Sequence, residues 1–121
     1  MFHTAAVRAM LMERLAAAEN PADRAYQDQA FMVGILSLLD VLLGAEMTYV
    51  MEQLSVADEV KSALLAHTGR VGRLLSLVES KEANDQAAVE RILSDVKGVP
   101  LSGLMQAELA AVAWADRIAS N

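Results

Sequence analysis

The sequence contains no cysteine, which excludes disulfides, thiolate catalysis and cysteine-based zinc sites together. We therefore expect a reducing, cytoplasmic compartment. Aromatic residues make up only 4% of the chain, whereas 55% of all residues are hydrophobic, drawn largely from Ala, Leu, Val and Met. Because these side chains favour helices over strands, the composition predicts an all-α protein.

Positive charge is also scarce, with 10 Lys and Arg against 16 Asp and Glu and a formal net charge of −6. Such a chain repels a phosphate backbone, so we expect no nucleic-acid partner. Arg70 and Arg73 are predicted to lie on a solvated helix face rather than in an anion site. At the N-terminus, Arg8, Glu13 and Arg14 interrupt the apolar residues, which does not fit a signal peptide.

The most apolar stretch runs from Phe31 to Gly44 and is interrupted before Leu43 only by Gly34, Ser37 and Asp40, which fall three apart. A helix that is apolar nearly all round is usually buried, so we predict the central helix of a small bundle. The stretch is shorter than the ~20 apolar residues that cross a bilayer, and we expect no membrane association. The small side chains at 34, 37 and 44 are expected to allow close helix packing.

Apolar spacing predicts about seven irregularly packed helices in a single compact domain, 1–121. Thr4, Ser55 with Asp58, Asp85 and Ser102 are the expected N-terminal caps. Gly44 and Gly98 are expected to end helices. The predicted helices cover 5–19, about 22–43, 47–54, 56–66, 70–83, 86–96 and 103–118.

Four stretches of the chain form a recognisable series: Arg8 to Ala16, Phe31 to Asp40, Gly72 to Glu79, and Ala113-Trp114-Ala115. In this order they resemble the C-terminal part of the HDOD domain, in the version found behind an EAL domain in bacterial cyclic di-GMP signalling proteins. The phrase Gly-Ile-Leu-Ser-Leu-Leu-Asp from Gly34 to Asp40 is the most specific. The resemblance implies a degenerate HD-domain-like helical fold without catalysis of its own. Because the amino-terminal half of the domain is missing, we expect a piece of a longer chain with Met1 as an artificial start.

The same resemblance bears on metal binding. Metal-dependent relatives carry a ligating His-Asp pair where this chain has Ser37 and Leu38. A hydroxyl and an isobutyl group cannot replace an imidazole and a carboxylate as metal ligands. We therefore expect no catalytic residue, no metal and no cofactor. The family commonly has a cysteine where Leu11-Met12 occur here, and nothing in the chain reproduces the EAL signature.

Three residues are candidates for an interaction or for pinning helices together: Asp40, Ser37 and Trp114. A carboxylate in so apolar a stretch needs a donor, so Asp40 is expected to bond a neighbouring loop or basic residue, or to contact an adjoining domain. Trp114 is expected to anchor the last helix, or to be an interface residue if exposed.

Several other polar or flexible residues are expected to be structural. His3 and His67 are the only histidines and too few for a cluster of ligands. Glu79, Glu82 and Asp85 are predicted to be a solvated acidic run. The methionines are expected to fill the core rather than to form an adaptable binding surface. They are Met10, Met12, Met32, Met47, Met51 and Met105.

The leading interpretation is a non-catalytic regulatory and protein-interaction module that contacts an adjoining EAL-type or other signalling domain, or a second copy in a homodimer. Two alternatives stay open. One is a divergent metal-dependent phosphohydrolase of the HD type, and the other is a pure homo-oligomerisation module.

Overall fold

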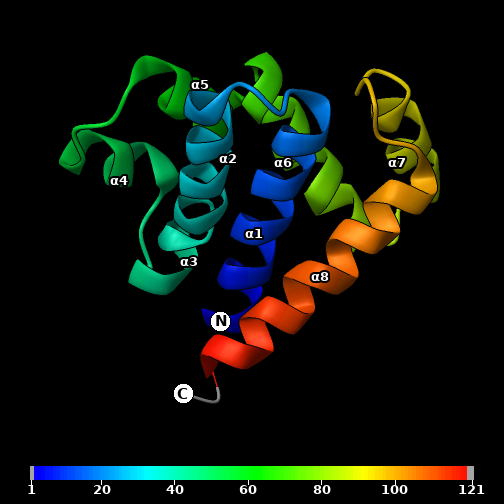
Figure 1. Cartoon of the computed structure of the whole chain (residues 1–121). Coiled ribbons are helices and arrows are strands. Elements are labelled where there is room, and N and C mark those ends of the chain that lie inside the picture. The colour runs from blue at the N-terminus through cyan, green and yellow to red at the C-terminus, as the bar shows by residue number, and fades with distance from the viewer. Residues whose placement is uncertain (1, 120–121) are drawn as a thin grey trace.

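The computed structural model describes residues 2–119, which form eight helices and contain no strand (Figure 1). The all-α prediction is confirmed. The helices are α1 (Phe2–Glu19), α2 (Arg24–Leu36), α3 (Leu39–Leu43), α4 (Met47–Gln53), α5 (Asp58–Ala66), α6 (Gly69–Glu82), α7 (Gln86–Leu93) and α8 (Leu101–Ala119).

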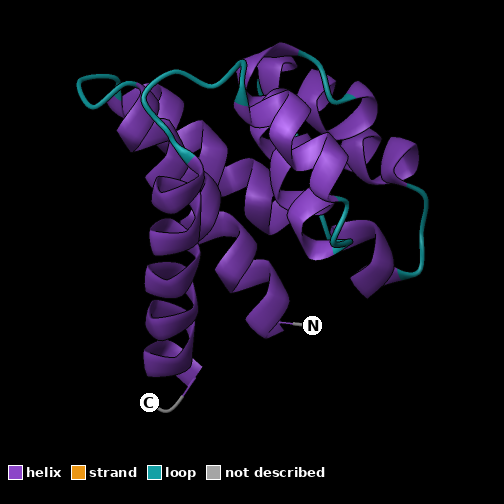
Figure 2. Ribbon diagram, turned by 90° about the vertical axis from the view of Figure 1, so that its right-hand side faces the viewer, coloured by secondary structure: helices purple, strands orange, loops and turns teal. Residues whose placement is uncertain are grey.

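Helix α1 lies at the centre and contacts α2, α6 and α8 (Figure 1). The ends of α1 and α8 that carry the chain termini lie near each other. Helix α8 stands at one edge of the molecule, where it leads to the C-terminus in Figure 2. Within the described residues, the buried core contains side chains from every helix except α3. Its most buried members include Leu11, Met12, Leu15, Tyr26, Val33, Leu74, Leu75, Leu77 and Leu104.

The packing of α2 on α1 depends on Gly34. A Cβ atom added at Gly34 would lie 2.4 Å from the Cα of Ala9, closer than real Cβ contacts. Because only a hydrogen occupies this place, the two helix backbones approach closely. The predicted role of Gly34 in close packing is confirmed.

The expected continuous helix through the apolar stretch is divided into α2 and α3 at Ser37 and Leu38. Leu38 has φ −109° and ψ 5°, and Oγ of Ser37 donates to the carbonyl oxygen of Gly34 at 2.8 Å. Such a bond from a side chain to the preceding turn competes with regular helical bonding and favours a bend. This division gives one helix more than the predicted number.

The prediction that this stretch is buried is wrong over much of its length. Arg24–Leu43, taken as one helix of 20 residues, has only 33% of its most apolar part buried inside the protein. Within 2–119 it is the one helix long and apolar enough to cross a membrane. Length and composition alone are weak evidence for a membrane span, because the core helix of a soluble protein can have both properties. Helix α3 contains no buried residue. It lies mainly against the short helix α4, which does not cover it.

Three predicted caps are also wrong. Thr4 and Ser102 lie inside α1 and α8, because these helices begin earlier than expected. Ser55 precedes α5, which begins at Asp58 after extended backbone at Ala57. By contrast, Asp85 caps α7 as predicted, accepting a hydrogen bond from the N–H of Ala88.

The helix ends predicted at Gly44 and Gly98 agree better with the structure than the predicted caps do. Gly44 has a φ of 65° and ends α3, as predicted, because glycine adopts the left-handed conformation without strain. Helix α7 ends at Leu93, earlier than expected, and Val96 is buried in the connection before Gly98.

Candidate functional site

The most distinctive polar feature is the buried guanidinium of Arg8, on α1. Its side chain is only 7% exposed. Nε and Nη2 donate to the two carboxylate oxygens of Glu82, at 3.0 and 2.5 Å, and Nη1 donates to Oγ of Ser37 at 2.8 Å. Nη1 also lies 3.8 Å from a carboxylate oxygen of Glu79. We call Arg8, Ser37, Glu79, Glu82 and His67 the Arg8 cluster.

His67 joins this cluster through Glu79, whose Oε1 lies 2.7 Å from Nε2 of the imidazole. His67 ends α5 with a φ of 56°, in the left-handed region. A Cβ at Gly72 would lie 2.4 Å from the carbonyl carbon of His67, so only glycine permits this approach of α6 to the end of α5. The cluster therefore connects α1, α2, α5 and α6.

The sequence analysis assigned no role to Arg8, whose charge was noted only as an interruption of an apolar stretch, yet the residue is 6% exposed. The prediction of a solvated acidic run holds in part, because Glu82 and Asp85 are exposed and Glu79 is half-buried. It missed that Glu79 and Glu82 both face Arg8. A signal was available, because Ala5, Arg8, Met12 and Leu15 follow alternating spacings of three and four.

The chemistry of the cluster is that of a satisfied ion pair. Two parallel N–H···O bonds between Arg8 and Glu82 are the strong, geometrically specific form of this interaction. The remaining nitrogen, Nη1, is bonded to Ser37. Among residues 2–119, no group of three or more His, Cys, Asp or Glu side chains is arranged to hold a metal ion.

The three residues predicted for interaction or helix pinning do not come together. Ser37 bonds Arg8. Asp40 is half-buried and its carboxylate accepts only the N–H of Val41 within the described residues, so the expected bond to a loop or basic residue is wrong. Trp114 is half-buried and packs edge-to-face on Phe31 of α2, with ring centroids 6.2 Å apart. Trp114 thus links α8 to α2.

A second polar group joins α1, α2 and α6 near the α1–α2 loop. Tyr26 is buried, and its hydroxyl donates to the carboxylate of Glu19. Burial, with the hydrogen bond and charge of Glu19, raises the pKa of Tyr26 well above its ordinary value. The guanidinium of Arg70 stacks 4.0 Å from the centre of the Tyr26 ring, and that of Arg73 lies 3.9 Å from Glu19.

Asp23 completes this region as the N-terminal cap of α2. Its Oδ1 accepts the N–H of Tyr26 at 3.0 Å, and its Oδ2 lies 3.0 Å from Arg70. The hydrogen bond from the backbone N–H of Tyr26 and the nearby guanidinium of Arg70 lower the pKa of Asp23 from its ordinary value. Arg70 and Arg73 are 45% and 41% exposed, which agrees with the predicted solvated face, although each also pairs with an acid.

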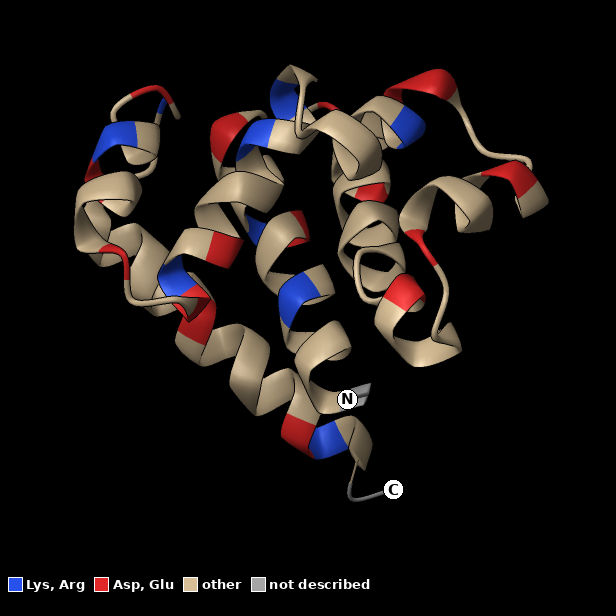
Figure 3. Ribbon diagram, turned by 180° about the vertical axis from the view of Figure 1, so that it is seen from behind, with Lys and Arg blue, Asp and Glu red and all other residues tan. Residues whose placement is uncertain are grey.

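The remaining expectations have mixed outcomes. Met12 and Met51 fill the core, whereas Met32 and Met105 are about half exposed, so core filling does not hold for every methionine. His3 is exposed and its Nε2 lies 2.8 Å from Asp116, which ties α1 to α8. Acidic and basic residues are scattered along the ribbon in Figure 3, and the basic ones form no continuous stripe in that view.

The chain is similar to two curated bacterial proteins. It is 37% identical over 95 residues to the cyclic di-GMP phosphodiesterase CdgJ of Vibrio cholerae, covering 78% of this chain and 22% of that protein. It is 35% identical over 79 residues to the uncharacterized protein YuxH of Bacillus subtilis, covering 65% of this chain and 19% of that protein. The chain thus spans about a fifth of either relative. No family model and no solved structure matches it significantly.

Proposed function

We propose that the chain is a non-catalytic regulatory module of bacterial cyclic di-GMP signalling, corresponding to the C-terminal part of an HDOD domain. The similarity to CdgJ supports the signalling context. The helical fold and the four ordered stretches that resemble the HDOD family support the assignment to that domain. Such a module acts through protein contacts rather than through chemistry.

The observation that carries this proposal is the bond between Arg8 and Ser37. Ser37 stands where the resemblance places a metal-ligating histidine, and here its Oγ accepts a hydrogen bond from a buried cation. A divalent metal at this place would be repelled by the guanidinium, strongly so in a poorly solvated setting. The carboxylates of Glu79 and Glu82 are already oriented toward Arg8 and His67.

The module would act by presenting a helical surface to an adjoining phosphodiesterase or other signalling domain, or to a second copy. A partner that binds one conformation of that domain better than another shifts its equilibrium by the difference in binding free energy. Exposed apolar side chains offer such contact surface on two parts of the fold. They are Met32, Ile35, Val41, Leu42 and Leu43 on α2 and α3, and Leu101, Met105, Leu109, Val112 and Ile118 on α8.

Cyclic di-GMP hydrolysis tests the proposal in two steps. The chain alone, with Mg²⁺ or Mn²⁺, is expected to give no turnover. A cyclic di-GMP phosphodiesterase encoded with this chain is then assayed with segment 4–118 present, absent or replaced by an unrelated helical bundle of equal length. We expect a changed rate only with the native segment.

Each other result has a definite meaning. Metal-dependent turnover by the chain alone would contradict the proposal and favour a divergent phosphohydrolase. Equal rates in all three phosphodiesterase forms would exclude direct control of catalysis. A stable dimer of the chain combined with equal rates would favour the pure homo-oligomerisation module.

A further inference from the structure

An open groove of about 500 Å³ runs between α1 and α2. Met10 and Glu13 of α1 form one wall. The other wall is one face of α2, which repeats at intervals of three and four residues. The α2 lining residues are Asp28, Phe31, Met32, Ile35 and Leu36.

The groove is apolar and accessible to a partner. Met32 is 45% exposed and Ile35 is 39% exposed, although both belong to the stretch expected to be buried. At its side, Phe31 is held by the edge-to-face contact with Trp114 of α8. A concave apolar surface with rigid aromatic support is typical of sites that receive an apolar side chain from a partner.

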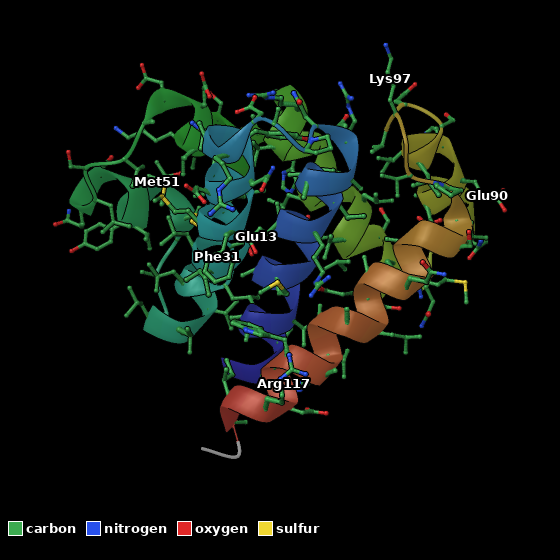
Figure 4. The ribbon with its side chains drawn as sticks, in the orientation of Figure 1. Glu13, Phe31, Met51, Glu90, Lys97 and Arg117 are labelled. Atoms are coloured by element: carbon green, nitrogen blue, oxygen red, sulfur yellow. The ribbon has the colours of Figure 1, made fainter. Side chains whose placement is uncertain are left out.

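The two polar lining residues are both acidic and lack cationic partners. Glu13 and Asp28 make no hydrogen bond or ion pair with any residue of 2–119, and no Lys or Arg of that range lines the groove. By contrast, Glu19 and Glu82 in the two polar clusters described above pair with Arg73 and Arg8. Glu13 and Phe31 lie close together on the face turned toward the viewer in Figure 4. The charge of the groove therefore complements a cation.

The dimensions of the groove fit about two turns of a helix. Asp28 and Ile35 are separated by seven residues, which is about 10 Å along α2. Anchors at positions i, i+4 and i+7 of a docked helix span the same length. Because α2 runs antiparallel to α1 with Gly34 against Ala9, Glu13 and Asp28 both lie toward the α1–α2 loop, and Met10, Ile35 and Leu36 lie toward the other end.

We propose that this groove docks a cationic amphipathic helix, with apolar anchors on Phe31, Met32 and Ile35 and Lys or Arg beside Glu13 and Asp28. The inference rests on the proposed function, since it names the surface and partner class through which the module would act. On α8 the two carboxylates, Glu108 and Asp116, already pair with Lys81 and His3, so the charges beside its exposed face do not indicate a particular partner.

A displayed library of short helical peptides tests this proposal. The peptides carry Leu at i, i+4 and i+7, and Lys, Glu or Gln in all combinations at the flanking positions. Selection of peptides that bind the intact chain is expected to enrich Lys over Glu at the flanking positions. Selected peptides are then resynthesised and their affinities measured by fluorescence anisotropy against four folded variants: Glu13→Gln/Asp28→Asn, Ile35→Asn, Leu109→Asn and Glu90→Gln.

The expected pattern separates the groove from other surfaces. Glu13→Gln/Asp28→Asn should weaken binding about three- to twenty-fold, with the remaining affinity less dependent on salt. Ile35→Asn should weaken it about tenfold or more. Glu90→Gln, which removes one negative charge at the far side of the molecule in Figure 4, and Leu109→Asn on the outer face of α8 should change nothing.

Three outcomes would overturn the groove assignment: no binder from the library, no preference for Lys over Glu, or binding lost with Leu109→Asn but kept with Ile35→Asn. None of them affects the phosphodiesterase comparison, because peptide binding is measured without nucleotide. Conversely, equal phosphodiesterase rates with groove-dependent peptide binding would remove the regulatory role and keep the docking site.

Discussion

Nη1 of Arg8 donates a hydrogen bond to Oγ of Ser37 at 2.8 Å, and the same hydroxyl donates to the carbonyl oxygen of Gly34 at 2.8 Å. A hydroxyl can accept from one group and donate to another at once, so Ser37 connects α1 to the last turn of α2. Ser37, which the resemblance places opposite a metal-ligating histidine of other proteins, is therefore part of the packing between two helices.

The two acidic partners of Arg8 should contribute unequally to stability. Glu82→Ala removes both hydrogen bonds to Arg8 and leaves a buried guanidinium without its main partner, so we expect the free energy of unfolding to fall by about 2–3 kcal/mol. This loss is smaller than for a fully buried ion pair, because Glu82 is partly hydrated. Glu79→Ala removes a 3.8 Å contact and should cost below about 1 kcal/mol. Urea unfolding measures both, with Glu108→Ala as the control at the separate, half-buried Lys81–Glu108 pair. Equal losses at 79 and 82 would contradict this ranking.

The helical fold followed from composition and apolar spacing, because both report local backbone preference. Most helices were placed within a few residues, and the apolar spacing within 70–83 corresponds to a buried stripe of α6 formed by Val71, Leu74, Leu75 and Val78. The caps at Thr4, Ser55 and Ser102 failed because cap side chains such as Ser and Thr are also tolerated inside a helix or in a loop. Choosing among these places requires tertiary contacts.

The candidate site was harder to predict than the fold. Ser37 was identified through a resemblance, whereas Arg8 was missed because its charge suggested solvent despite its place in the buried spacing. Its partner Glu82 is 74 residues away, and nothing local pairs the two. The stretch from Phe31 to Gly44 was expected to be buried because its residues are apolar nearly all round. Composition alone does not show whether other helices of the same chain cover these residues.

Alkaline titration should reveal the buried hydroxyl of Tyr26. The folded state holds the pKa of Tyr26 above the unfolded value of about 10, so its contribution to stability is complete below that pH and is lost as the pH rises. Tyr26→Phe should cost about 1 kcal/mol at neutral pH and give a shallower fall in stability above pH ~10. Denaturant unfolding across this range measures both. The control is Tyr49→Phe, since Tyr49 is 57% exposed, and an identical alkaline slope for Tyr26→Phe and the parent chain would refute the assignment.

Gly34 should be difficult to replace, as should Gly72, because a Cβ atom at either position would lie 2.4 Å from backbone. Gly34→Ala places a methyl group 2.4 Å from backbone of α1, so the helices must separate, and we expect a loss of about 2–4 kcal/mol despite the better helix propensity of Ala. Gly103→Ala is the matched control on α8, where the new methyl meets the side chains of Pro100 at 3.3 Å and Val99 at 3.8 Å but no backbone, and its effect should be within about 1 kcal/mol of zero. Thermal unfolding compares them. A Gly34→Ala protein as stable as the parent would show that α1 and α2 are not packed this closely.

The contact between Phe31 and Trp114 should be energetically coupled, because it is the one aromatic pair recorded within residues 2–119. A double-mutant cycle with Phe31→Leu and Trp114→Leu is expected to give a coupling energy of about 0.5–1.5 kcal/mol, the range of edge-to-face pairs beyond area burial. The control cycle pairs Phe31→Leu with Met105→Ala, on the same helix but nine residues, or about 14 Å, from Trp114, and should be additive. Urea unfolding supplies the four free energies in each cycle. Equal coupling in both cycles would mean that Phe31 responds to α8 as a whole, and the support of the groove wall would then come from helix docking rather than from the indole.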